Sequence, residues 1–148
     1  MCIFQTLPPV IDNGRFMHSM SSPEIITLKY SYKKPDTDIW VLNVDDIPVD
    51  KALVKDQQIV HFAPGAIGGN HKHPRTEWFV AVGDLVFYWL DDDGKRHEEH
   101  MHPNGEIRLI TVPPYLPHAV VNRSKDQVAV LFELADGKQE NVEEVKVV

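Results

Sequence analysis

Two histidines one residue apart, followed four residues later by a glutamate, form the part of the sequence best suited to chemistry. They are His71, His73 and Glu77, in the stretch GGNHKHPRTEWFV. Successive side chains of a β-strand point to opposite faces, so the two imidazoles are expected to project the same way and to chelate one ion. Pro74 favours a tight connection, after which Glu77 opens the next strand and returns its carboxylate to the same point. The pattern predicts a metal site.

A fourth candidate ligand, His118, lies far along the chain in the stretch VPPYLPHAVVN. It begins an apolar stretch directly after a proline-stiffened turn, so it is expected to be buried or at a cavity mouth. A buried imidazole without a partner costs about 1–3 kcal/mol, and a metal ion would satisfy it. A His-x-His pair alone is also typical of a solvated strand surface. The combination with Glu77 and His118 favours the metal.

A second histidine cluster lies in the stretch RHEEHMHPNGE, with His97, His100 and His102 beside Glu98 and Glu99. It is a candidate for an additional metal site. However, His97 and His100 have opposite strand parity, and the whole segment is polar. We therefore interpret it as a solvated hairpin.

The elements that must position these residues are short runs of β-branched and aromatic residues closed by Gly, Pro, Asn or Asp. Such runs are typical of an all-β sandwich or barrel. We expect a single domain, with a barrel over residues 24–135, an N-terminal arm over residues 1–23 and a C-terminal tail over residues 136–148. The expected strands are Ile25–Ser31, Asp38–Asn43, Gln58–Ala63, Glu77–Val82, Leu85–Leu90, Arg96–Met101, Ile107–Val112, Ala119–Asn122 and Gln127–Leu134.

One of these strands, Leu85–Leu90, is apolar on both of its alternating faces. A strand that faces water on one side would alternate with polar residues. We expect the barrel interior to cover one face and an N-terminal strand or a second subunit to cover the other. This feature favours a homodimer.

Composition restricts the possible partners. The net charge of −7 argues against nucleic-acid or anionic-membrane binding and leaves a small molecule as the expected partner. The one cysteine, Cys2, can form neither an intrachain disulfide nor a thiolate cluster. We read neither a signal peptide nor a membrane-spanning run in the sequence, so a cytoplasmic protein is expected.

The two ligand-bearing segments resemble the two motifs of the cupin superfamily. The first motif matches at Gly65, His71, His73, Glu77 and Gly83, and the second at Pro113, His118 and Asn122. The interval from Glu77 to Gly83 is one residue shorter than the commonest pattern. Tyr115 stands where a glycine usually precedes the histidine. The resemblance implies a cupin-type double-stranded β-helix, or jelly-roll barrel, with the metal inside.

Three neutral imidazoles and one carboxylate suit one divalent transition metal, such as Zn, Mn, Fe or Ni, and leave positions open for substrate. The stretch GNHKHPRTEWFVAVGD is similar to that of cupins that process nucleotide sugars. Three functions stay open: a metal-dependent isomerase or epimerase acting on a (nucleotide-)sugar, a mononuclear iron dioxygenase, and a non-catalytic cupin that senses or stores a ligand.

Further side chains are candidates for substrate contact. Arg75, beside the ligand hairpin, is a candidate to meet a phosphate or carboxylate, and Tyr115 to act as a general acid or a lid. The alternative for Arg75 is a solubilising residue on an exposed turn. Several aromatic residues could line the apolar face of a sugar or simply pack in the core. They are Trp78, Phe79, Tyr88 and Trp89.

Overall fold

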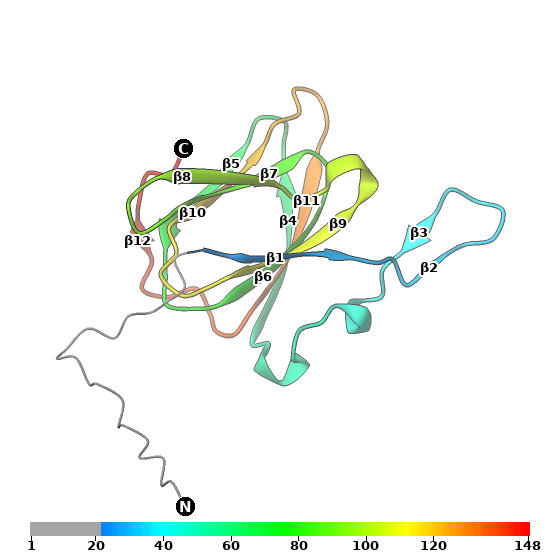
Figure 1. Ribbon diagram of the computed structural model, residues 1–148, viewed down its shortest axis with the longest axis horizontal. Helices are drawn as coiled ribbons and strands as arrows, with labels where there is room; N and C mark the ends of the chain where they lie inside the picture. Colours follow the sequence, from blue (N-terminus) through cyan, green and yellow to red (C-terminus); the bar gives the residue numbers. More distant parts are fainter. Residues whose placement is uncertain (1–21) are drawn as a thin grey trace, which may run out of the picture.

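Two five-stranded antiparallel sheets packed face to face make up the body of the molecule in this computed structural model, which describes residues 22–148 (Figure 1). The first sheet runs in the order β1 (Glu24–Leu28), β9 (Ile107–Val112), β6 (Glu77–Val82), β11 (Ala129–Ala135) and β4 (Asp56–Phe62). The second sheet runs in the order β12 (Glu143–Glu144), β5 (Ile67–Lys72), β10 (His118–Asn122), β7 (Leu85–Leu90) and β8 (Arg96–His100).

The remaining elements are small. A two-stranded hairpin of β2 (Tyr32–Lys33) and β3 (Trp40–Val41) projects from the barrel (Figure 1). Short 3₁₀ turns span Val44–Asp46, Lys51–Leu53 and Pro103–Gly105. No helix among residues 22–148 has the length and apolar character needed to cross a membrane. The predicted all-β, cupin-like jelly-roll fold is confirmed.

The core lies between the two sheets because alternate residues of each strand point inward. In β6, Phe79 and Ala81 face the core, while Val80 lies on the outer face of the sheet. Ile47 and Val49, in the segment that precedes β4, are buried against that outer face. The first sheet is therefore apolar on both sides. The barrel interior itself is lined by Phe62, Phe79, Leu85, Phe87, Ile110, Val112, Val120 and Leu131, among others.

The strand that is apolar on both faces, β7, is covered on its outer side by the end of the chain. Val86 and Tyr88 pack there with Val147, which is only 5% exposed. The backbone N–H groups of Val147 and Val148 donate to the side-chain oxygen of Asn70, at 2.9 and 3.0 Å, and hold the segment in place. The covering group is thus the protein's own C-terminal segment. The apolar outer face of β7 therefore gives no support to a homodimer, which stays a prediction.

All nine expected strands are found, some with ends that differ by up to three residues. The C-terminal residues contribute β12, which pairs with β5, and β5 itself was not delimited as a separate strand in the sequence. The expected N-terminal arm and Cys2 lie outside the described residues, apart from residues 22 and 23 of the arm.

Candidate metal centre

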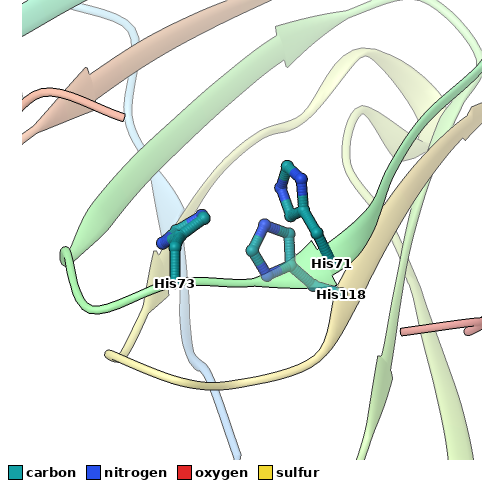
Figure 2. A group of neighbouring side chains, drawn as sticks. All are labelled: His71, His73 and His118. Carbon is teal, nitrogen blue, oxygen red and sulfur yellow. The ribbon is translucent and has the colours of Figure 1, made fainter. Parts of the chain in front are cut away.

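Strands β5, β6 and β10 bring the histidines and the glutamate to one place inside the barrel. His71 lies in β5, His73 follows the last residue of that strand, and Glu77 opens β6 after a short turn. The first residue of β10, His118, is the register partner of His71. Figure 2 shows the three imidazoles gathered together, two from the β5 segment and one from β10. The convergence of two distant segments expected from the sequence is therefore present.

A glycine permits the close approach of β10 to β5. Gly69 has a φ of +87°, and a Cβ atom placed on it would lie 2.9 Å from the backbone oxygen of His118. Any larger residue would push β10 away from β5 and would adopt a strained backbone. The Pro-rich turn is also tied down, because the backbone N–H of Tyr115 donates to the carbonyl oxygen of His73 at 2.8 Å. Both contacts fix His118 relative to the pair on β5.

The spacing of the ligand atoms suits one ion. Each of the three histidines offers a nitrogen, and these nitrogens all lie within 4.8 Å of one another. The carboxylate oxygens of Glu77 lie 3.2 Å from Nε2 of His73 and 3.2 Å from Nε2 of His118. Ligand atoms that share an ion at about 2.0–2.2 Å are roughly 3.0–3.5 Å apart. The contacts of Glu77 with His73 and His118 match this spacing, and the three histidines form the group that could hold an ion.

Three buried polar atoms at this point have no hydrogen-bond partner. They are both ring nitrogens of His73 and Oε2 of Glu77, on side chains that are 1% and 2% exposed. A buried polar atom without a partner costs about 1–3 kcal/mol, more when it is charged. A metal ion would satisfy Oε2 and one ring nitrogen at once. This donor set is the strongest structural argument for an ion.

The protonation states also suit metal binding. Nδ1 of His118 lies 2.8 Å from the carbonyl oxygen of Leu116, which fixes the proton on Nδ1 and leaves the Nε2 lone pair facing Glu77. Burial, together with the neighbouring imidazoles, lowers the pKa of His71 to about 4, so its ring is neutral near pH 7. Burial alone would raise the pKa of Glu77, but the contacts with His118 and His73 lower it well below its usual range.

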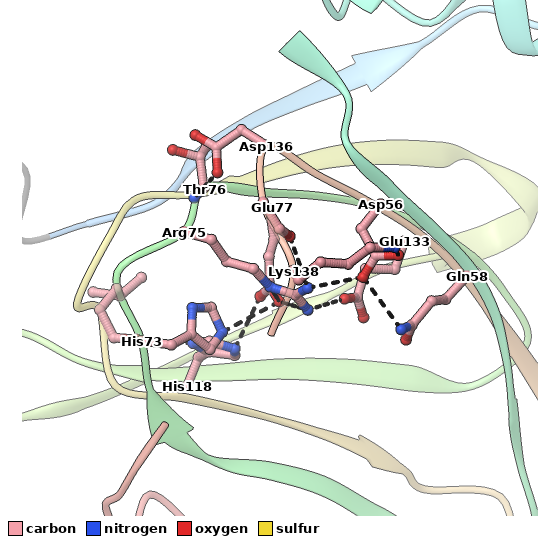
Figure 3. A network of polar contacts seen from close by, with 12 residues as sticks. Asp56, Gln58, His73, Arg75, Thr76, Glu77, His118, Glu133, Asp136 and Lys138 are labelled. Carbon is pink, nitrogen blue, oxygen red and sulfur yellow. Dashed lines mark hydrogen bonds and ion pairs between the residues drawn. The ribbon is translucent and has the colours of Figure 1, made fainter. Parts of the chain in front are cut away.

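Arg75 is buried beside the site and is shared by carboxylates. Its Nη2 and Nε atoms donate to Oε1 of Glu77 at 2.6 and 2.9 Å, and Nη2 also contacts Glu133 at 2.5 Å. Nη1 donates to Asp56 at 3.2 Å (Figure 3). The residue is 5% exposed, so the exposed solubilising turn considered from the sequence is wrong. Its guanidinium is already occupied and holds the carboxylate of Glu77 in place, which leaves it poorly placed to meet a substrate phosphate.

A cavity of about 250 Å³ opens beside the ligand residues. Glu133, from β11, lines it next to Glu77, although the sequence did not single this residue out. Burial and the charge of Glu77 raise the pKa of Glu133 to about 7. The sequence did contain a clue to this role. Glu133 is the one acidic residue of the otherwise apolar strand AVLFELA, and it lies two residues after the inward-facing Leu131, so it points inward as well.

The other candidates from the sequence lie elsewhere. Tyr115 is 61% exposed and is outside the set of residues that line the cavity. Its φ of +62° is a backbone conformation that favours glycine. This explains why a glycine usually stands at the corresponding position of the cupin motif. Asn122 is fully buried at the other end of β10, where its side-chain NH₂ donates to three backbone carbonyls. Among the four aromatic candidates, Phe79 lines the cavity.

The second histidine cluster does not converge. Nε2 of His97 lies 2.7 Å from Oδ2 of Asp91, and its ring stacks on Trp89. Nδ1 of His102 accepts a hydrogen bond from the backbone of Gly83, and His100 is exposed on β8. Within residues 22–148, the histidine group able to hold an ion is the one formed by His71, His73 and His118.

No protein-family model matches the sequence, and no curated protein matches it either. Solved structures do share its fold. A dTDP sugar isomerase from Desulfovibrio desulfuricans superposes with a TM-score of 0.66 at 14% identity, over 84% of this chain and 84% of its own. The sugar 3,4-ketoisomerase QdtA from Thermoanaerobacterium thermosaccharolyticum, solved with TDP, gives 0.56 at 14% identity, over 80% of this chain and 82% of its own.

A third similar structure is the capsular polysaccharide assembling protein CapF from Staphylococcus aureus, with a TM-score of 0.54 and 16% identity. The likeness covers 62% of this chain but 27% of CapF, so the chain spans about a quarter of that protein. At these identities the comparisons show the fold. They confirm the fold that the resemblance to the cupin superfamily implies.

Proposed function

We propose that the chain is a metal-dependent enzyme of the isomerase or epimerase type that acts on a small oxygenated substrate. His71, His73, Glu77 and His118 would hold one divalent ion. The observation that carries the proposal is the set of unpartnered buried atoms on His73 and Glu77 within a group of three imidazoles. The fold shared with sugar isomerases supports the reaction class.

Bound there, a divalent ion would supply a Lewis acid that stabilises negative charge developing on a substrate oxygen. The chain's own residues supply the rest of the site. Arg75 fixes one oxygen of Glu77 and leaves Oε2 turned toward His118. Glu133 lines the cavity beside Glu77, and this position suits a group that takes a proton from a substrate carbon and returns it.

The test is the exchange of a C–H proton next to a carbonyl with solvent deuterium, followed by NMR on a panel of small ketoses. We expect exchange with protein loaded with Mn²⁺ or Zn²⁺ and none after chelator treatment. The variant Glu133→Gln should keep the metal and lose the exchange. His100→Ala is the matched control and should keep both, because His100 lies on β8 away from the site.

Other results of the same experiment would favour the alternatives. Exchange that persists in metal-free protein would contradict the proposed role of the ion. Oxygen uptake by the Fe²⁺-loaded protein without deuterium exchange would favour a dioxygenase. Bound metal with neither activity across the panel would favour a non-catalytic ligand-binding protein.

A further inference from the structure

We propose that the cavity takes a small oxygenated compound without phosphate groups, about the size of a pentose, and excludes its phosphorylated and nucleotide-linked counterparts. This inference rests on the proposed function and names the substrate class for that site. It departs from the TDP bound to the similar ketoisomerase QdtA. Three features support this inference. They are the volume of the cavity, the mixture of apolar and hydrogen-bonding side chains in its walls, and the pairing of the nearby cationic side chains with carboxylates.

The volume limits the part of a ligand that the cavity can enclose. The cavity holds about 250 Å³. A protein cavity of about 150 Å³ accepts benzene, so this one accepts roughly ten non-hydrogen atoms, whereas a nucleoside diphosphate sugar has about three times that number. A pentose fits the cavity. A nucleotide-linked sugar would have to leave most of its atoms outside.

The walls are divided between apolar and hydrogen-bonding side chains. Alternate residues of β4 point inward, so Gln58, Val60 and Phe62 line one side, and Leu131 and Glu133 of β11 continue it. Gln58 is exposed, so it marks a point at which the cavity meets solvent. A neutral polyol or hydroxyketone matches this arrangement, because amides and a carboxyl group bind hydroxyls and the apolar wall covers a carbon chain.

The charges beside the cavity disfavour an anion. The residues that line it include neither lysine nor arginine. Arg75, behind the wall, is held by Glu77, Glu133 and Asp56. Lys138 lies 2.9 Å from Oδ1 of Asp56 and is therefore also paired.

Apart from the proposed ion, a phosphate in the cavity would therefore meet no cationic side chain, and it would face the carboxyl group of Glu133. Like charges placed together at a binding surface suppress the wrong ligand. Lys146 lies in a neighbouring groove between β5 and the C-terminal segment, which Gly69 and His71 also line. The side chains that line the cavity therefore offer a phosphate no cationic partner beyond the ion, whereas the hydroxyl groups of an uncharged ligand find several hydrogen-bonding partners there.

The experiment uses Co²⁺-loaded protein, whose visible absorption reports on ligands next to the ion. We would titrate it with xylulose, xylulose 5-phosphate and TDP. Xylulose is expected to change the spectrum, and each phosphorylated probe is expected to bind at least tenfold more weakly. Glu133→Gln should narrow the difference between xylulose and xylulose 5-phosphate, because it removes the negative charge from the wall.

Two variants on neighbouring residues of β4 test the size limit. Val60→Phe fills the cavity and should weaken the xylulose response at least tenfold while Co²⁺ stays bound. Ile59→Phe is the matched control, since Ile59 points outward and is 78% exposed, and should bind xylulose as the wild type does.

The outcomes separate the two proposals. Failure to bind Co²⁺ would overturn the proposed function and this inference with it. With Co²⁺ in place, phosphorylated probes that bind as tightly as xylulose, whether in the cavity or through Lys146, would overturn the inference alone. Absence of any response to xylulose would do the same.

Discussion

Replacing Arg75 by methionine removes the cation that Glu77, Glu133 and Asp56 share and keeps an unbranched side chain of similar length in its place. The side chains of Arg75 and Glu77 are 4% and 2% exposed, so solvent cannot take over the role of the guanidinium. Breaking a buried ion pair by removing one partner costs about 3–5 kcal/mol. We expect Arg75→Met to lower the free energy of unfolding of the metal-free protein by about 3 kcal/mol at pH 8.

The cost should depend on pH with a definite sign. The pKa of Glu133 is raised to about 7 in the folded protein, above its ordinary value, so the folded state binds more protons at this group and the contribution of Glu133 to stability falls as pH rises toward 7. Without Arg75 this pKa rises further, and the loss of stability extends to higher pH. At pH 5 Glu133 is protonated in both proteins, so the difference between wild type and Arg75→Met should be smaller there than at pH 8.

Urea titrations at pH 5 and pH 8 measure both quantities. Arg123→Met is the matched control, because Arg123 pairs with Glu98 at 3.6 Å on the surface and both side chains are about half exposed. Such a pair contributes less than about 1 kcal/mol. A cost for Arg75→Met no larger than that of the control, or a cost equal at both pH values, would refute the assignment of Arg75 as the shared buried cation.

Three other substitutions give separate outcomes. Glu133→Gln should make the slope of stability against pH between about pH 4.5 and 7, measured by urea titration, more positive than in the wild type, since the group whose contribution falls over this range is gone; an unchanged slope would exclude that contribution. Tyr115→Gly should raise the free energy of unfolding by about 0.5–1 kcal/mol, because glycine adopts a positive φ without strain. A decrease would show that the contacts of the tyrosine ring stabilise the protein by more than the backbone strain costs. His100→Ala should leave the metal content by elemental analysis unchanged, whereas a lost ion would place the site on β8.

The sequence was sufficient for the fold and for placing His71 and His73 side by side, because both depend on local rules. Alternation and turn residues delimit most strands, and the spacing of His71 and His73 puts both imidazoles on one side of the chain. The pairing of β10 with β5, which brings His118 opposite His71, is a long-range contact. It was anticipated through the resemblance to a known pair of motifs.

The charged side chains around the candidate ligands could not be predicted from the sequence in this way. Arg75 is four residues from His71, but its partners Glu133 and Asp56 come from β11 and the start of β4, and their meeting depends on how the first sheet is assembled. The cover over β7 also escaped prediction, because Val147 reaches Val86 from the other end of the chain. An apolar strand shows that a cover exists and does not say which segment provides it.

The most direct test of the metal site is a crystal of the protein grown with Mn²⁺ or Zn²⁺ and measured by anomalous diffraction. We expect one anomalous peak per chain, about 2.0–2.2 Å from nitrogens of His71, His73 and His118 and from Oε2 of Glu77. A peak among His97, His100 and His102 instead, or no peak at saturating metal, would contradict it.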